Sequence, residues 1–158
     1  MKYSIDSCTL IVARRDIFPV DIVPAFWDKL NEAITAGDIR ATELVADELE
    51  AKEGDEDELY RWTQDQQGLY VPIDEPIQKE VKSILKRHPG LVNIKKNKSG
   101  ADPFVVALAR INGCAVVTQE VKSGPGGAPK IPNVCADLDV ECINLLTLCR
   151  RQEWKFTK

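Results

Sequence analysis

The stretch KYSIDSCTLIV, residues 2–12, opens the chain with an apolar run that one carboxylate, Asp6, interrupts. Its Tyr, Ile, Thr and Val residues favour a β-strand. A strand inside a sheet does not tolerate a charge without a partner, because burying an unpaired carboxylate costs free energy. We therefore predict a strand at residues 3–12 and expect Asp6 to have a specific partner or task.

Extended and helical segments alternate after this strand. Short extended stretches are expected at 39–42, at 69–73 (a strand or an extended link) and at 114–120. Helical spacing of apolar residues and stop signals such as Gly37, Gly68, Pro89-Gly90 and Gly113 predict helices between them. These helices are expected within 19–37, 43–50, 55–68, 75–90, 101–113 and 140–154, with a loop at 121–135. Such alternation indicates an α/β fold with a mainly parallel sheet, formed by a single domain over residues 1–158.

The composition fits an ordinary globular chain. Its 158 residues carry a net charge of −4, so nothing overall indicates a nucleic-acid-binding protein. The charges are nevertheless uneven: residues 43–58 hold nine acids and one Lys, whereas residues 82–101 hold six Lys or Arg and no acid. Two solvated faces would explain this pattern, and a basic surface for a polyanion is the alternative.

The expected location is the cytoplasm. No apolar stretch approaches a membrane span, and the N-terminal residues do not resemble a signal peptide. The five cysteines form no C-x-x-C pair, so we interpret them as reduced thiols packed like small apolar residues.

Four acids stand where an α/β sheet forms its binding sites, at strand ends and at the beginnings of helices. They are Asp6, Glu48, Asp102 and Glu120. Carboxylates that converge repel one another unless a cation lies between them, and Mg²⁺ or Mn²⁺ is the hard cation that prefers oxygen ligands. Such a site can activate a water against a phosphodiester. Taken singly, Asp102 could be a helix cap and Glu48 a solvated acid, with Asp47 and Glu50 as rivals for its position.

The ordered set of motifs resembles the PIN-like domain family. YSIDSCTLI resembles the family's first block, ELVADELE its second and GADPFVVALARINGCAVVTQE its third, in which an Asp opens a helix that leads into a strand with a Thr and an acid at its end. The chain is most similar to the small prokaryotic, VapC-type subfamily of toxin ribonucleases. The resemblance implies a three-layer α/β/α sandwich. The chain departs from the family pattern at Glu120, where family members usually have an Asp.

The resemblance also implies a function, which we state as an expectation: an Mg²⁺- or Mn²⁺-dependent endoribonuclease, the toxin of a toxin–antitoxin pair. Asp6, Glu48, Asp102 and Glu120 would be the catalytic and metal-binding acids, supported by Ser7 and Thr118. The expected partners are an RNA substrate, an antitoxin protein and, as one oligomeric alternative, a second copy of the chain, with no membrane contact. A catalytically silent binding module and a DNA nuclease remain alternatives. RNA phosphates would meet lysines of the basic stretch and of the 121–130 loop, namely Lys95, Lys96, Lys98, Lys122 and Lys130.

Overall fold

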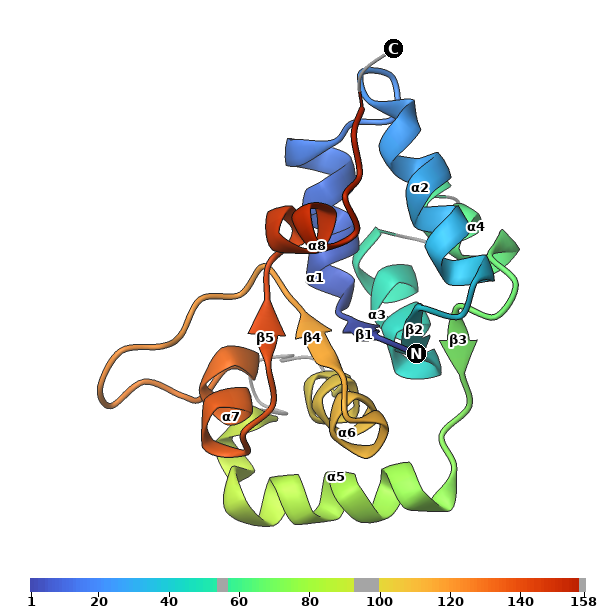
Figure 1. Ribbon diagram of the computed structural model, residues 1–158. Coiled ribbons are helices and arrows are strands. Elements are labelled where there is room, and N and C mark those ends of the chain that lie inside the picture. Colours follow the sequence, from blue (N-terminus) through green and yellow to red (C-terminus); the bar gives the residue numbers. More distant parts are fainter. Residues whose placement is uncertain (54–56, 93–99, 157–158) are drawn as a thin grey trace.

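A parallel five-stranded sheet forms the centre of the computed structural model, which describes residues 1–53, 57–92 and 100–156. The strand order is β3-β2-β1-β4-β5, and every neighbouring pair is parallel. Helices cover both faces: α5, α6 and α7 are grouped below the strands in the view of Figure 1, whereas α1, α2 and α8 lie above them. The predicted three-layer α/β/α class is confirmed. The strands are β1 (Tyr3–Ile5), β2 (Ile39–Thr42), β3 (Tyr70–Val71), β4 (Ala115–Val117) and β5 (Cys142–Ile143).

The first strand is shorter than predicted. β1 ends at Ile5, Asp6 keeps an extended backbone, and residues 7–12 form helix α1 (Ser7–Val12). The Asp6 carbonyl accepts the Thr9 N–H at 3.1 Å, which starts the first helical turn. The apolar run that we assigned to a strand is instead a helix that buries Leu10 in the core. A π-helical turn, η1 (Ala13–Ile17), continues it.

The middle of the chain follows the predicted alternation. The short strand expected at 39–42 is confirmed as β2. Gly37, the predicted stop of α2, has φ +81°, and a Cβ there would stand 3.1 Å from the Arg40 guanidinium. Gly therefore allows both the left-handed turn and the close approach of Arg40. The helices here are α2 (Pro24–Thr35), α3 (Glu43–Glu53) and α4 (Glu58–Asp65).

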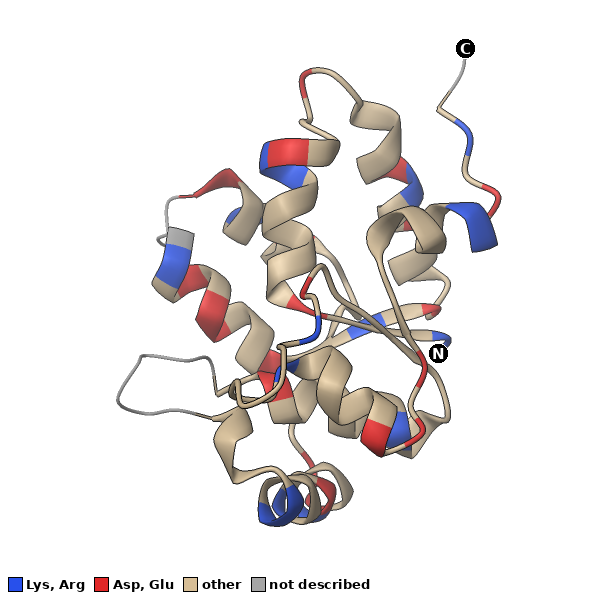
Figure 2. Ribbon diagram, turned by 90° about the vertical axis from the view of Figure 1, so that its left-hand side faces the viewer, with Lys and Arg blue, Asp and Glu red and all other residues tan. Residues whose placement is uncertain are grey.

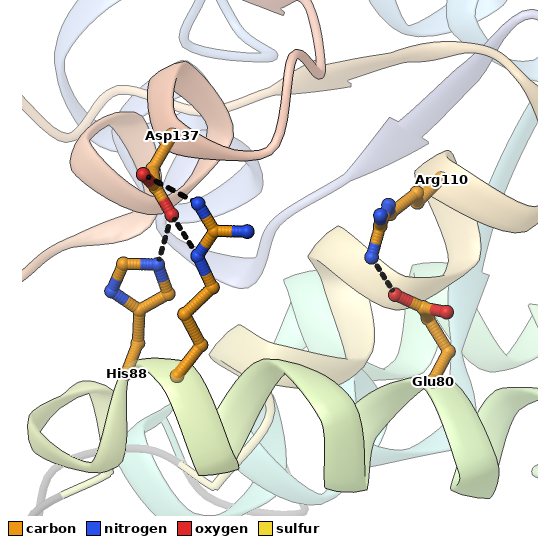
Figure 3. A network of polar contacts seen from close by, with 5 residues as sticks. Glu80, His88, Arg110 and Asp137 are labelled. Atoms are coloured by element: carbon orange, nitrogen blue, oxygen red, sulfur yellow. Dashed lines mark hydrogen bonds and ion pairs between the residues drawn. The ribbon is translucent and has the colours of Figure 1, made fainter.

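Helix α5 (Glu75–Arg87) is tied to its neighbours by ion pairs (Figure 3). Asp137 accepts from Arg87 Nε at 2.7 Å and contacts His88 Nε2 at 2.8 Å, which links α5 to α7 (Ile131–Asp137). Arg110 pairs with Glu80, which links α5 to α6 (Asp102–Asn112). The short 3₁₀ turn η2 (Pro89–Leu91) follows α5. These contacts hold the lower helix layer together.

Two predictions for the C-terminal third need correction. The loop predicted at 121–135 ends earlier, because α7 begins at Ile131 with Pro132 in its first turn, a position that suits Pro. The helix predicted at 140–154 is preceded by the edge strand β5, and α8 (Leu145–Arg151) begins only after Asn144. Asn144 accepts the Thr147 N–H at 2.8 Å and so caps α8.

The core lies on both sides of the central strand β1 and its neighbour β4, whose residues are all buried. The aromatic rings of Phe18, Phe26 and Trp154 pack together between η1, α2 and the C-terminal segment. Acidic and basic positions are interspersed over most helices (Figure 2). In the part of the chain that the structure describes, no helix is long and apolar enough to cross a membrane.

Candidate active site

The strand order places a crevice at the carboxyl ends of β1 and β4. The chain adds strands on one side of β1 (β2, then β3) and later on its other side (β4, then β5), so the direction of winding reverses between β1 and β4. Open α/β sheets bind their ligands at such a switch point. Ile5 pairs with Val117 at the end of both strands, and the Asp6 N–H donates to the Val117 carbonyl at 3.1 Å. Asp6 and Thr118 therefore emerge side by side.

Asp6 is the centre of this site. Its side chain is almost fully buried, and Oδ2 accepts a hydrogen bond of 2.9 Å from the Thr118 hydroxyl. The Thr118 oxygen in turn accepts the backbone N–H of Glu120 at 3.1 Å. One hydroxyl thus joins the ends of the neighbouring strands β1 and β4.

Glu48 reaches the same place from α3. Its Oε2 accepts the Ser7 hydroxyl at 2.6 Å, and Oε1 accepts the Ala101 N–H at 3.1 Å. Its rivals Asp47 and Glu50 are exposed on the same helix. Glu48 is consequently the acid of this segment that the fold brings to Asp6, and Ser7 is the residue that connects the two.

Asp102 comes from the far side of the site, at the first position of α6. It is 6% exposed and is followed by the buried Pro103. The Ala101 N–H that Glu48 accepts immediately precedes it. The fold therefore brings the beginning of α6 to α3.

Glu120 lies two residues beyond Thr118 and belongs to the rim of the site. Its Oε2 accepts the Ile131 N–H at the beginning of α7 from 3.0 Å. The longer Glu side chain thus fastens the loop after β4 to α7. It remains close enough to Asp6 for its charge to act on that carboxyl.

The electrostatics of the site centre on Asp6. Burial raises the pKa of Asp6 from 3.8 to about 6, the Thr118 hydroxyl opposes this rise, and the charges of Glu120 and Glu48 add to it. Burial also raises the pKa of the neighbouring Cys8 thiol to about 11, helped by the charges of Asp6 and Glu120. Burial is the largest cause of the Asp6 shift, and the charges of Glu120 and Glu48 act in the same direction, as neighbouring carboxylates do.

The donor set suits a hard cation, although the side chains do not form a closed cage. Within residues 1–53, 57–92 and 100–156, no group of three or more His, Cys, Asp or Glu side chains is arranged to hold a metal ion. Glu48 and Glu120 instead each accept a hydrogen bond from a backbone N–H with one carboxylate oxygen. Mg²⁺ commonly takes only one or two protein carboxylates and keeps its waters, and the buried Asp6 and Asp102 offer oxygen ligands of this kind.

The predicted basic residues fall into two groups. Lys122 is exposed and lines a hollow beside Glu120, and Lys130 stands half-buried just before α7. Lys95, Lys96 and Lys98 lie outside the described residues. The hollow itself was not predicted, because the strand β5 and the helix α7 that form its walls were both missed in the sequence.

Comparison with family models identifies the chain. It matches, over residues 3–156, the model described as "Domain of unknown function (DUF4411)". The chain belongs to the DUF4411 family. A comparison with curated proteins found no match for this DUF4411 chain.

Solved structures share the fold of the DUF4411 chain. "Structure of FitAB bound to IR36 DNA fragment" aligns with a TM-score of 0.53 at 19% identity, covering 91% of this chain and 94% of that one. "Crystal Structure of FitAcB from Neisseria gonorrhoeae" aligns with a TM-score of 0.51 at 19% identity, covering 91% and 97%. At this identity the likeness concerns the fold, which is PIN-like.

Proposed function

We propose that the DUF4411 chain is a metal-dependent endoribonuclease that hydrolyses RNA phosphodiesters. The observation that carries this proposal is the buried Asp6 at the switch point, whose pKa is raised to about 6 by burial and by the charges of Glu120 and Glu48. A carboxyl in this state gains from a cation, because the cation offsets both the burial cost and the repulsion. Asp6 and Asp102 would hold Mg²⁺ or Mn²⁺, with Glu48 and Glu120 acting directly or through water.

The residues of the chain have separate tasks in this proposal. A bound divalent cation would supply an activated water and neutralise charge that develops on the phosphate. Thr118 and Ser7 orient the Asp6 and Glu48 carboxylates through their hydroxyls. Lys122 offsets the negative field of the acids where a phosphate chain approaches.

We further propose that the chain is the toxin of a toxin–antitoxin pair. The first support is the resemblance of its three motif blocks to VapC-type toxins. The second is the PIN-like fold that it shares with structures titled FitAB and FitAcB. An antitoxin that inserts an Arg or Lys among the acids would add a positive charge beside the buried Asp6.

Cleavage assays test the enzymatic part. Purified protein is incubated with single-stranded RNA and with DNA of the same sequence, in Mg²⁺, in Mn²⁺ and in EDTA. We expect RNA cleavage that EDTA abolishes and that Asp6→Asn and Asp102→Asn both lose. Asp28→Asn, on the exposed face of α2, is the control for the same chemical change. Cleavage of DNA alone would establish the DNA nuclease alternative, and binding of RNA without cleavage would establish the silent binding module.

Growth assays test the toxin part separately. Expression of the wild type should arrest growth, Asp6→Ala should not, and the product of the adjacent gene should restore growth. Harmless expression of an enzyme that cleaves RNA in vitro would reject the toxin assignment and leave the nuclease intact.

A further inference from the structure

A hollow of about 440 Å³ opens directly beside the acidic site. It lies between the segment that follows β4, helix α7 and the edge strand β5. Thr118 and Glu120 form the side that faces the acids. The other walls include Lys122, Pro132, Ala136 and Cys142. Its volume falls within the range of small-molecule sites.

The Asn133 side chain joins the two ends of the loop that forms one wall. Oδ1 of Asn133 accepts the Ser123 N–H at 3.0 Å, the Ser123 hydroxyl at 3.1 Å and the Lys130 N–H at 3.1 Å. Asn133 Nδ2 donates back to the Ser123 carbonyl at 3.3 Å. The two ends of the loop are thus closed on the first turn of α7. A wall held in this way is formed before a ligand arrives, which lowers the entropic cost of binding.

The chemistry of the hollow combines an apolar surface with a cation and donors. Val121 at its edge is 76% exposed, an unusual position for a β-branched apolar residue, and Pro132 adds a second apolar wall. Lys122 supplies a positive charge beside Glu120. Asn144 gives its oxygen to the α8 cap, so the group that it can offer a ligand is its NH₂ donor.

We propose that this hollow holds one nucleotide of the nucleic-acid strand, next to the phosphodiester that is hydrolysed at the acidic site. The base would lie against Val121 and Pro132, its carbonyl groups would meet the Asn144 donor, and its phosphate would meet Lys122. This inference rests on the proposed nuclease function and deepens it, because it assigns part of the sequence preference to the wall formed by α7 and β5. A phosphate beside Glu120 needs a cation nearby, and Lys122 is that cation.

Filling the hollow tests the proposal. The probe is a 2′-O-methyl RNA tetranucleotide of mixed sequence, titrated onto the whole protein in EDTA, in which the proposed metal-dependent cleavage does not take place. Ala136 is an exposed residue of α7, so Ala136→Phe fills the hollow at small cost to folding. We expect the Kd to rise by about tenfold or more, equivalent to about 1.4 kcal/mol. Ala25→Phe makes the same exchange at an exposed position of α2 and should leave the Kd unchanged.

A second pair of variants avoids any question of folding. Val121→Asp places a negative charge at the edge of the hollow, whereas Ile22→Asp places the same charge at a residue that is 71% exposed elsewhere. Only Val121→Asp should weaken binding of the probe. A Kd within twofold of the wild type for both Ala136→Phe and Val121→Asp would overturn the proposal.

Cysteine alkylation supplies a readout that needs no activity. The hydrogen bond with the Cys135 thiol lowers the pKa of Cys142, which favours its reaction with iodoacetamide. Saturating probe should slow alkylation of Cys142 but not of Cys114, which lines a different hollow beside Met1 and Tyr3. Equal protection of both thiols, or of neither, would contradict the proposal. If the probe protects Cys142 but the protein cleaves no RNA in the presence of metal, the nuclease function is rejected and the nucleotide site is kept. If the wild type cleaves RNA but Ala136→Phe binds the probe with normal affinity, the nucleotide site is rejected and the nuclease function is kept.

Discussion

The hydroxyl of Ser7 donates a hydrogen bond of 2.6 Å to Oε2 of Glu48, across 41 positions of the chain. Ser7 also stands next to Asp6, with its oxygen 3.5 Å from Oδ1 of that carboxylate. A small buried hydroxyl thus spaces two carboxylates that would otherwise repel one another, and it ties α3 to the end of β1. Glu48 also has a positive neighbour on its own helix, because Lys52 Nζ lies 3.9 Å from the same Oε2.

The first prediction concerns the cost of the Asp6 charge. A pKa raised from 3.8 to about 6 means that ionising Asp6 costs the fold about 3 kcal/mol, since each pH unit corresponds to about 1.4 kcal/mol. The folded state binds this proton more tightly than the unfolded state, so stability falls as pH rises from about 4 to about 6. In EDTA, Asp6→Asn should therefore equal the wild type near pH 4 and exceed it at pH 7.5. Urea unfolding at both pH values measures this, and a variant less stable at pH 7.5 would mean that the Asp6 charge has a structural partner.

The second prediction tests whether the Ser7 hydroxyl supports the acidic site or only contributes to the packing of the core. Ser7→Ala leaves the Glu48 oxygen without its donor, so it should cost about 1–3 kcal/mol of stability and lower cleavage about 10- to 100-fold. Ser4→Ala is the matched control, because Ser4 is equally buried and donates to the Val105 carbonyl at 2.8 Å. Ser4→Ala should lose stability but retain cleavage per folded molecule. Equal loss of cleavage in both variants would remove Ser7 from the site.

The third prediction concerns Thr118. Its hydroxyl lowers the pKa of Asp6, so Thr118→Val should raise that pKa further. The acidic limb of the pH–rate profile should then move to higher pH. Thr9→Val removes a different buried hydroxyl, one that donates to the Val117 carbonyl at 3.1 Å, and should leave the limb in place. A profile that does not move in Thr118→Val would show that another group sets the acidic limb.

The fourth prediction concerns the phosphate chain. Lys122→Ala should weaken RNA binding and reduce the slope of log K against log salt by about 0.7, the value for one lost contact to a single strand. Lys79→Ala removes the same charge from an exposed position of α5 and should leave the slope unchanged. Fluorescence titrations at several salt concentrations measure both slopes. Identical slopes in the two variants would exclude a direct contact of Lys122 with RNA.

The fifth prediction concerns the anchoring of α7. His88 and Arg87 lower the pKa of Asp137, so this contact stabilises the fold at neutral pH and is lost as pH falls and Asp137 is protonated. Asp137→Asn should increase hydrogen exchange in α7 at neutral pH. Glu80→Gln, which cuts the tie between α5 and α6, should leave α7 protected. Unchanged exchange in Asp137→Asn would show that apolar packing alone holds the helix.

The sequence predicted the fold class because it follows from the order of helices and strands along the chain. Gly37 and Gly113 stop their helices as expected, and Asp102 with Pro103 opens α6. The fate of residues 7–12 could not be predicted in this way: Leu10, Ile11 and Val12 suit a strand locally, but they form a helix that buries Leu10 in the core. The two residues of β5 are too few to give a periodic signal. The hydroxyls of Ser7 and Thr118 were named from the family resemblance, whereas their bonds depend on distances that only the fold sets.

The Thr118 hydroxyl and the Asp6 carboxylate are separated by 112 positions, and their bond closes the site between the first and fourth strands. A ribosome that makes this chain releases Asp6 long before Thr118, which stands 112 positions later. No shorter nascent chain can assemble the acids around Asp6, because β4 must first take its place against β1. The acidic site around Asp6 therefore forms only after strands β1, β2 and β3 and the helices between them have been synthesised.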